Sequence, residues 1–154
     1  MDSAPAELPE GFGTVSTNFG QGELFLSNKE GDSYRLSWGA ESSKDDQVRA
    51  LPAGVYDLRT YRIVSRVDGE DWHLSGSAPS IKKVKVEAGE NLLVKLEDTI
   101  HMGSHIGGGR AQMSITGDSG SGLSIYRAGK RIPIGYRILN KSGDVVASGD
   151  MRYG

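Results

Sequence analysis

Apolar residues recur at every second position in several short stretches of this chain, and glycine, proline and polar residues separate the stretches. One run lies at 23–27, and the next alternates Tyr34, Leu36 and Trp38 after a polar segment at 28–32. A two-residue period is typical of a β-strand with one buried face. The polar segment between the two runs therefore predicts an antiparallel hairpin.

The longest strand-like stretch is 51–67, LPAGVYDLRTYRIVSRV, and it contains a change of phase. Tyr56 and Leu58 share one parity, whereas Tyr61 has the other, so a regular strand cannot place all three side chains on one face. One extra residue near positions 59 and 60 would bring both sets to the same side. We therefore predict a β-bulge or a sharp bend at this point.

Further alternating runs continue the β pattern almost to the C-terminus. They lie at 72–74, 81–87, 91–97, 111–115, 123–125, 132–138 and 145–153. About ten short strands with turn residues between them, and no helical periodicity, predict an all-β fold, a single antiparallel β-sandwich. We assign residues 22–154 to this domain. Residues 1–21 are rich in glycine, serine, proline and acidic residues, and we expect a flexible tail or linker there.

The segment 98–110, DTIHMGSHIGGGR, interrupts the alternation with four glycines and two histidines. Glycine-rich segments between strands usually form surface loops, and such loops often carry binding residues. The sequence therefore predicts the longest loop of the domain at this position.

Charge and cysteine content narrow the classes of function. The chain has 18 basic and 20 acidic residues, well mixed along its length, and a formal net charge of -2. This balance gives no expectation of nucleic-acid binding. The absence of cysteine excludes disulfides, thiolate catalysis and cysteine-ligated zinc. The first residues contain neither a basic nor a long apolar segment, so we expect no signal peptide and no membrane span in this stretch.

The segments LPAGVYDLRTY and VKVEAGENLLVKL resemble part of the prealbumin-like or carboxypeptidase-regulatory-like β-sandwich domains, which share an immunoglobulin-like architecture. The resemblance covers residues 51–97, about a third of the chain. It implies a non-catalytic accessory, adhesion or carbohydrate-associated module of an exported protein. It carries no active site over to this sequence.

The sequence Gly-Asp-Ser-Gly at 117–120 resembles the segment around the nucleophile of trypsin-like serine proteases. A serine nucleophile also needs a histidine base that a carboxylate orients, together with an oxyanion hole. His73 and His101 are the available bases for Ser119, and neither lies in a recognisable motif. A glycine-rich hairpin turn is the simpler interpretation of this segment.

Two other candidate sites fall in the segment 98–110. His101 and His105 are four residues apart and would share one face of a helix, where Asp98 could complete a metal site. The three glycines before Arg110 would offer backbone N–H groups to an anion, next to a guanidinium. On a loop, solvated side chains are the simpler expectation for both, and we expect no cofactor.

Trp38 and Trp72 are the aromatic candidates for stacking against a sugar ring. The alternation places both with neighbouring leucines, which favours a position in the core. These considerations predict a non-catalytic module that binds a protein partner or glycan of the cell envelope, or serves a structural role, outside the cytoplasm. The alternatives are a hydrolase-like or metal-assisted enzyme that uses the His101/His105 loop with Ser119, and a structural domain that adds partner strands to an edge at 150–154.

Overall fold

The computed structural model describes residues 7–39, 47–77, 79 and 83–151. These residues form fourteen strands and no α-helix, which confirms the all-β prediction. Within the same residues, no helix is long and apolar enough to cross a membrane. The strands are β1 (Phe12–Thr17), β2 (Gly22–Ser27), β3 (Ser33–Trp38), β4 (Arg49–Pro52), β5 (Gly54–Val67), β6 (Glu70–Ser77), β7 (Lys83–Val86), β8 (Asn91–Val94), β9 (Ile100–Gly107), β10 (Arg110–Gly117), β11 (Gly122–Arg127), β12 (Lys130–Arg131), β13 (Gly135–Leu139) and β14 (Val145–Asp150).

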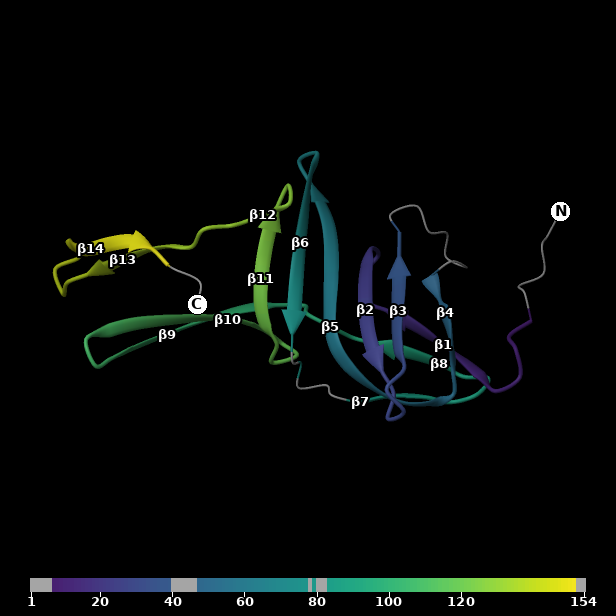
Figure 1. Cartoon of the computed structure of the whole chain (residues 1–154). Coiled ribbons are helices and arrows are strands. Elements are labelled where there is room, and N and C mark those ends of the chain that lie inside the picture. The colour runs from purple at the N-terminus through teal and green to yellow at the C-terminus, as the bar shows by residue number, and fades with distance from the viewer. Residues whose placement is uncertain (1–6, 40–46, 78, 80–82, 152–154) are drawn as a thin grey trace.

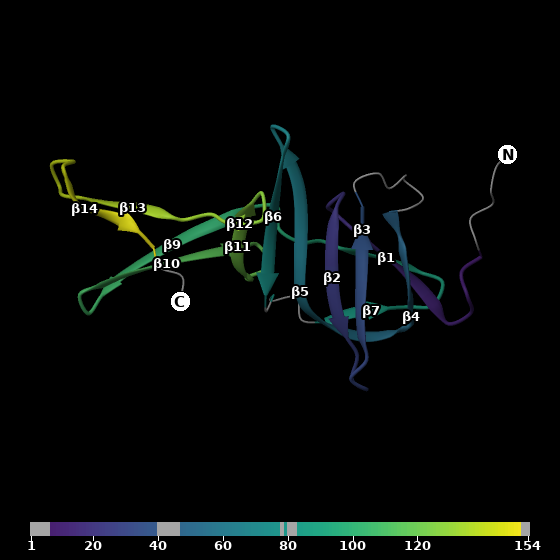
Figure 2. The ribbon, with the colours of Figure 1, turned by 45° about the horizontal axis from the view of Figure 1, so that its top comes forward.

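The strands form two packed layers with an extension at one end (Figures 1 and 2). The larger sheet has the order β3-β2-β5-β6-β11-β10-β9, with β7 on β5 and β12 on β11. A smaller sheet, β4-β1-β8, covers one half of it, and its β1–β8 pair is parallel. The connector at 88–90 therefore takes the chain from β7 in one sheet to β8 in the other. Strands β13 and β14 form a separate hairpin.

The hydrophobic core lies between the two layers. Its buried side chains are Val15, Phe19, Leu24, Leu26, Leu36, Trp38, Leu51, Tyr56, Leu58, Tyr61, Val84, Val86, Val94, Leu96 and Leu123. All but one of them come from the first 96 residues. The sandwich therefore occupies mainly the N-terminal two-thirds of the chain, and the later strands extend one of its sheets rather than close around the same core.

The expectation of a flexible tail at 1–21 is wrong for the part that the structure describes. Phe12–Thr17 form β1, which pairs with β4 on one side and with β8 on the other. Val15 is fully buried in this strand. Local composition suggested a tail because the segment is rich in glycine, serine and polar residues, whereas pairing on both edges stabilises the strand. Residues 1–6 lie outside the described residues.

The predicted β-bulge is present in β5. Phe25 of β2 pairs with Thr60, and the next residue, Leu26, pairs with Leu58, so Arg59 is the extra residue. Tyr56, Leu58 and Tyr61 are all buried as a result. The Arg59 side chain is on the exposed side, and its Nε donates to Ser27 Oγ at 2.8 Å.

The predicted loop at 98–110 is largely a hairpin instead. Strand β9 pairs with β10 without a register shift from Ile100 opposite Gly117 to Gly107 opposite Arg110. Gly108 and Gly109 have φ values of 58° and 72°, which suit a two-residue turn that matches the twist of the strands. The glycines and histidines interrupt the alternation of apolar residues along β9, so the sequence pattern alone resembles a loop.

Two hairpins project beyond the sandwich and are the most exposed part of the molecule (Figure 1). We call β9–β10 and β13–β14 the two arms. Every residue of β9 and β14 is exposed. The candidate edge that we placed at 150–154 begins at the end of β14, and residues 152–154 lie outside the described residues.

Candidate functional site

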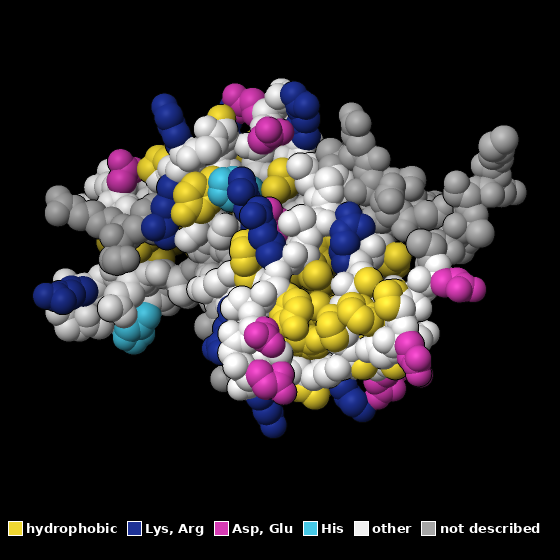
Figure 3. All heavy atoms as spheres, turned by 45° about the vertical axis from the view of Figure 1, so that its right-hand side comes forward, with side chains coloured by type: hydrophobic (Ala, Val, Ile, Leu, Met, Phe, Trp, Pro, Cys, Tyr) yellow, Lys and Arg dark blue, Asp and Glu magenta, His cyan; other side chains and the backbone are white. Residues whose placement is uncertain are grey.

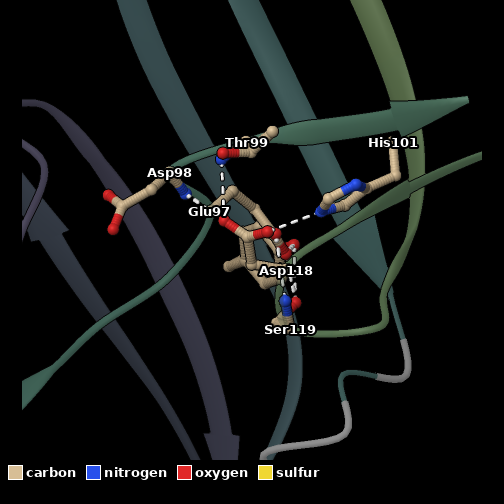
Figure 4. Close-up of polar contacts among 7 residues, drawn as sticks. Glu97, Asp98, Thr99, His101, Asp118 and Ser119 are labelled. Carbon is tan, nitrogen blue, oxygen red and sulfur yellow. Dashed lines mark hydrogen bonds and ion pairs between the residues drawn. The ribbon is translucent and has the colours of Figure 1, made fainter.

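The Gly-Asp-Ser-Gly segment forms the turn between β10 and β11, as its simpler interpretation predicts. Gly120 N donates to Gly117 O at 2.9 Å, and Gly120 has a φ of 71°. The turn lies beside the connection from β8 to β9, so Glu97, Asp98 and Thr99 contact it (Figure 4). Two different polar clusters result, one around Ser119 and one around Asp118.

The Ser119 cluster is centred on the Glu97 carboxylate. Glu97 Oε1 accepts hydrogen bonds from the hydroxyls of Ser119 and Tyr61, and Glu97 Oε2 accepts from Ser119 N at 3.2 Å. Ser119 Oγ also lies 2.6 Å from Ser121 Oγ. A Cβ at Gly117 would meet Glu97 Oε2 at 1.7 Å, so only glycine lets the carboxylate reach the turn.

The Asp118 cluster ties the start of β9 to the same turn. Asp118 Oδ2 accepts from Thr99 N at 2.8 Å and from Asp98 N at 3.2 Å, and Asp118 Oδ1 lies 2.6 Å from His101 Nε2. The hydrogen bond from His101, with those from the two backbone N–H groups, lowers the pKa of the Asp118 carboxyl below its ordinary value. Asp118 therefore stays ionised and holds the connection in place.

The geometry around Ser119 differs from that of an activated serine. Its hydroxyl contacts a carboxylate and two other hydroxyls, and the residue is only 5% exposed. His101 contacts Asp118 instead. A nucleophilic serine needs a base at its oxygen and access for the substrate. The arrangement around Ser119 serves to join the turn, β5 and the β8–β9 connection.

His73, the other base that we considered, lies on β6 opposite Tyr126, four residues along the strand from Ser77, which pairs with Gly122 beside the turn. It stacks on Tyr126 with ring centroids 4.3 Å apart, and its Nδ1 lies 3.4 Å from Arg62. Partial burial, and then the nearby Arg62 charge, lower the pKa of His73. These contacts describe a surface aromatic pair between β6 and β11.

The proposed metal ligands are not brought together. His101 and His105 lie on a strand, where four residues span about 13 Å, whereas zinc ligands lie about 2 Å from the ion. Asp98 Oδ1 accepts a hydrogen bond from Asn18 Nδ2 at 3.1 Å. In the described part of the chain, no three His, Asp or Glu residues are grouped where they could hold a metal ion. The helical spacing that suggested this site does not apply to an extended strand.

The three candidate ligand-binding residues are widely separated. Trp38 is 2% exposed, packs edge-on against Phe19 and donates from Nε1 to Gln47 O at 2.8 Å, so it is a core residue and not a sugar platform. Trp72 is partly buried, and the Arg127 guanidinium lies 5.5 Å from its ring centroid. Arg110 is exposed at the start of β10, beside the glycine turn.

An apolar concavity lies between the two arms, and sequence reasoning missed it. We call it the arm groove. It has a volume of about 680 Å³. Apolar side chains from both arms line it, among them Ile106, Met113, Tyr136 and Ile138. The signal for it in the sequence was the alternation of apolar and polar residues along β9 and β10. In the observed register Ile100, Met102 and Ile106 share one face with Ala111, Met113 and Ile115, while both histidines are on the other face.

A second, more polar groove of about 410 Å³ lies at the end of the sandwich. Tyr34 and Tyr56 meet edge to face there at 5.3 Å, and Glu30 and Asp32 stand at the rim, where both accept hydrogen bonds from Asn28. Figure 3 brings this end of the molecule forward and shows a hydrophobic surface with acidic side chains at its border. Asn28 therefore ties both carboxylates into the turn between β2 and β3.

The buried phenol of Tyr61 predicts a loss of stability at alkaline pH. Burial, assisted by the Glu97 carboxylate, raises the pKa of Tyr61 from 10.0 to about 12. The folded state therefore favours the neutral phenol, so this contribution is complete below about pH 10 and disappears as the pH rises toward 12. Two pKa units correspond to roughly 3 kcal/mol. Urea unfolding between pH 9 and 12 measures the loss, and Tyr61→Phe will show a shallower slope with pH than the control Tyr136→Phe. Equal slopes would contradict this assignment.

The chain matches no protein-family model, and the comparisons with curated proteins and with solved structures give no match. The geometry of this molecule and the resemblance of residues 51–97 are therefore the two sources of information about its function.

Proposed function

We propose that this chain is a non-catalytic β-sandwich module of an exported or cell-envelope protein, and that it binds an extended segment of a protein partner in the arm groove. The apolar lining of this groove is the observation that carries the proposal. Ile106 and Met113 from one arm, with Tyr136 and Ile138 from the other, converge on one concavity, and concave sites lined by apolar side chains with a few polar groups are typical of binding sites. The sandwich would serve as the rigid base that positions the two arms.

The exposure of individual side chains supports this use of the arms. Ile106 is 71% exposed and lines the groove, and Met102 is 62% exposed on the same face of the hairpin. Burial of such side chains on binding contributes about 25 cal/mol for each Å² of apolar surface removed from water. A partner with alternating apolar residues in an extended conformation fits a groove between two hairpins.

The non-catalytic part of the proposal rests on the Ser119 and Asp118 clusters. Each cluster joins segments that are distant in sequence, and neither presents an activated group to an open cleft. A protein ligand is preferred over a glycan because Trp38, one of the two stacking candidates, is in the core. The extracytoplasmic location is supported by the resemblance of residues 51–97 to modules of exported proteins.

Selection from a random peptide library on the immobilised chain tests the proposal. We expect the selected peptides to alternate apolar and polar residues, and we expect Ile138→Asp, in the groove wall, to weaken their binding at least about tenfold. The control is Val55→Asp, an exposed position at the other end of the molecule. Peptides that bind equally to both variants would contradict the arm groove as the site. A glycan array that gives the only response would replace the protein ligand with a sugar.

A further inference from the structure

We propose that the outer edge of β9 pairs with β9 of a second copy of this chain, antiparallel about a two-fold axis at Gly103. The pairing would join two nine-stranded sheets into one continuous sheet across the dimer. It goes beyond the proposed function because it uses the backbone edge of β9, whereas the arm groove uses side chains on one face.

Strand β9 is an end strand of the large sheet, and no strand of the described residues pairs with its outer edge. It is eight residues long and its pairing with β10 is free of bulges. Its sequence, IHMGSHIG, contains no lysine, arginine, carboxylate or proline. Edge strands of monomers are usually protected by such residues, by bulges or by being short. This edge has none of these protections and is open to another strand.

The strand at the other end of the large sheet differs from β9. Strand β3 carries Arg35, which forms an ion pair with Glu23 of the neighbouring strand and lies 5.7 Å from the Phe25 ring centroid. A charged side chain there disfavours the addition of a second strand. Of the two ends of this sheet, only β9 is therefore suited to pairing with a copy of itself.

One register makes β9 complementary to itself. With Gly103 on the axis, Ile100 lies opposite Ile106 of the second copy, and His101 lies opposite His105. Residues directly opposite each other in an antiparallel pair share a face of the sheet. The apolar faces of the two copies of the β9–β10 hairpin therefore merge on one side of the sheet, with both pairs of histidines on the other side. A shift of one residue would place each apolar face beside a polar face.

The pairing also gives the exposed apolar residues of β9 a neighbour. Cross-strand pairs of this kind stabilise a sheet, and the new ladder satisfies backbone groups along the whole edge. Because the faces of the sheet stay open, the arm groove of each copy remains accessible. Self-association and binding of a partner can therefore be tested, and can fail, separately.

A single cysteine at the axis tests the register. The chain has no cysteine, so Gly103→Cys can form a disulfide only with another copy. Directly opposed residues have Cα atoms about 4.5–5.5 Å apart, which is within the range that a disulfide spans. The new Cβ meets Ser114 Oγ at 2.8 Å, and that hydroxyl can rotate away. We expect a covalent dimer under mild oxidation at low protein concentration.

The matched control is Ser114→Cys, because Ser114 is opposite Gly103 on the neighbouring strand β10. In the proposed dimer the two copies of residue 114 are separated by three strand spacings, about 14 Å, which a disulfide cannot span. We expect this variant to remain without a cross-link. Equal cross-linking of both variants, or none in Gly103→Cys, would overturn the proposed register.

Sedimentation velocity over a concentration series tests the pairing without a covalent bond. We expect the unmodified chain to dimerise, and Met102→Lys to raise the dissociation constant at least about tenfold, because lysine protects an edge. Val146→Lys is the control, since Val146 on β14 is 61% exposed and Met102 is 62% exposed. A monomer at every concentration, or equal dissociation constants for the two lysine variants, would overturn the proposal. Retention of peptide binding by Met102→Lys would show that the arm groove functions without the dimer.

Discussion

Deletion of Arg59 will strongly destabilise the sandwich, whereas Arg59→Ala will change its stability little. Arg59 is the extra residue that lets Tyr56 and Leu58 on one side of the bulge, and Tyr61 on the other, face the same core. Without it, a regular β5 sends one of these sets to the solvent face. Loss of burial of two large side chains costs roughly 3–6 kcal/mol, and typical domains have a total stability of about 5–15 kcal/mol.

Urea unfolding, followed by the fluorescence of the buried Trp38, measures both variants. Arg59→Ala keeps the number of residues in β5 and removes only the exposed side chain and its hydrogen bond to Ser27. We expect it to cost less than about 1 kcal/mol. A deletion variant that unfolds at the same urea concentration as Arg59→Ala would show that β5 can shift its register without loss of the core.

Replacement of Glu97 by alanine will destabilise the fold by about 3 kcal/mol. The change removes the acceptor for the Tyr61 hydroxyl, the Ser119 hydroxyl and the Ser119 N–H group. Tyr61 and Ser119 are buried, so their donors cannot turn to bulk water. An unsatisfied buried donor costs roughly 1–3 kcal/mol, which makes this carboxylate one of the most important polar groups of the domain.

Two further variants distinguish the Ser119 cluster from a general effect of charge. Glu97→Gln keeps an amide oxygen as an acceptor and will lose less stability than Glu97→Ala. Glu87→Ala removes an exposed carboxylate that pairs with Lys85 on the surface, and such pairs contribute between 0 and about 1 kcal/mol. If Glu97→Ala and Glu87→Ala have the same unfolding midpoint in urea, the cluster does not stabilise the fold.

The proposed dimer and the proposed binding in the arm groove both involve the arms. Nearly all core side chains lie in the sandwich, and the arms carry six of the ten large apolar residues that are exposed in the described part of the chain. This division explains why the polar clusters lie at 97–101 and 117–121, where the arm joins the sandwich (Figure 4). Together with the pairing of Thr116 with Gly122 of β11, they fix the direction of β9 and β10.

The sequence by itself determined the features that depend on local periodicity. The alternation predicted the β2–β3 hairpin, the phase change in β5 predicted the bulge at Arg59, and the glycines predicted the turn at 117–120. Each of these follows from which side chains can share one face of a strand and which residues can adopt turn geometry. No information from distant parts of the chain was needed.

Only the tertiary structure decided the features that depend on pairing between distant segments. Strand β1 is a strand because β4 and β8 lie on either side of it, and β9 is a strand because β10 returns beside it. The roles of Glu97 and of the arm groove arise in the same way. A single sequence shows which face each residue takes within its own strand, but the identity of the strand opposite depends on the cooperative packing of the whole chain.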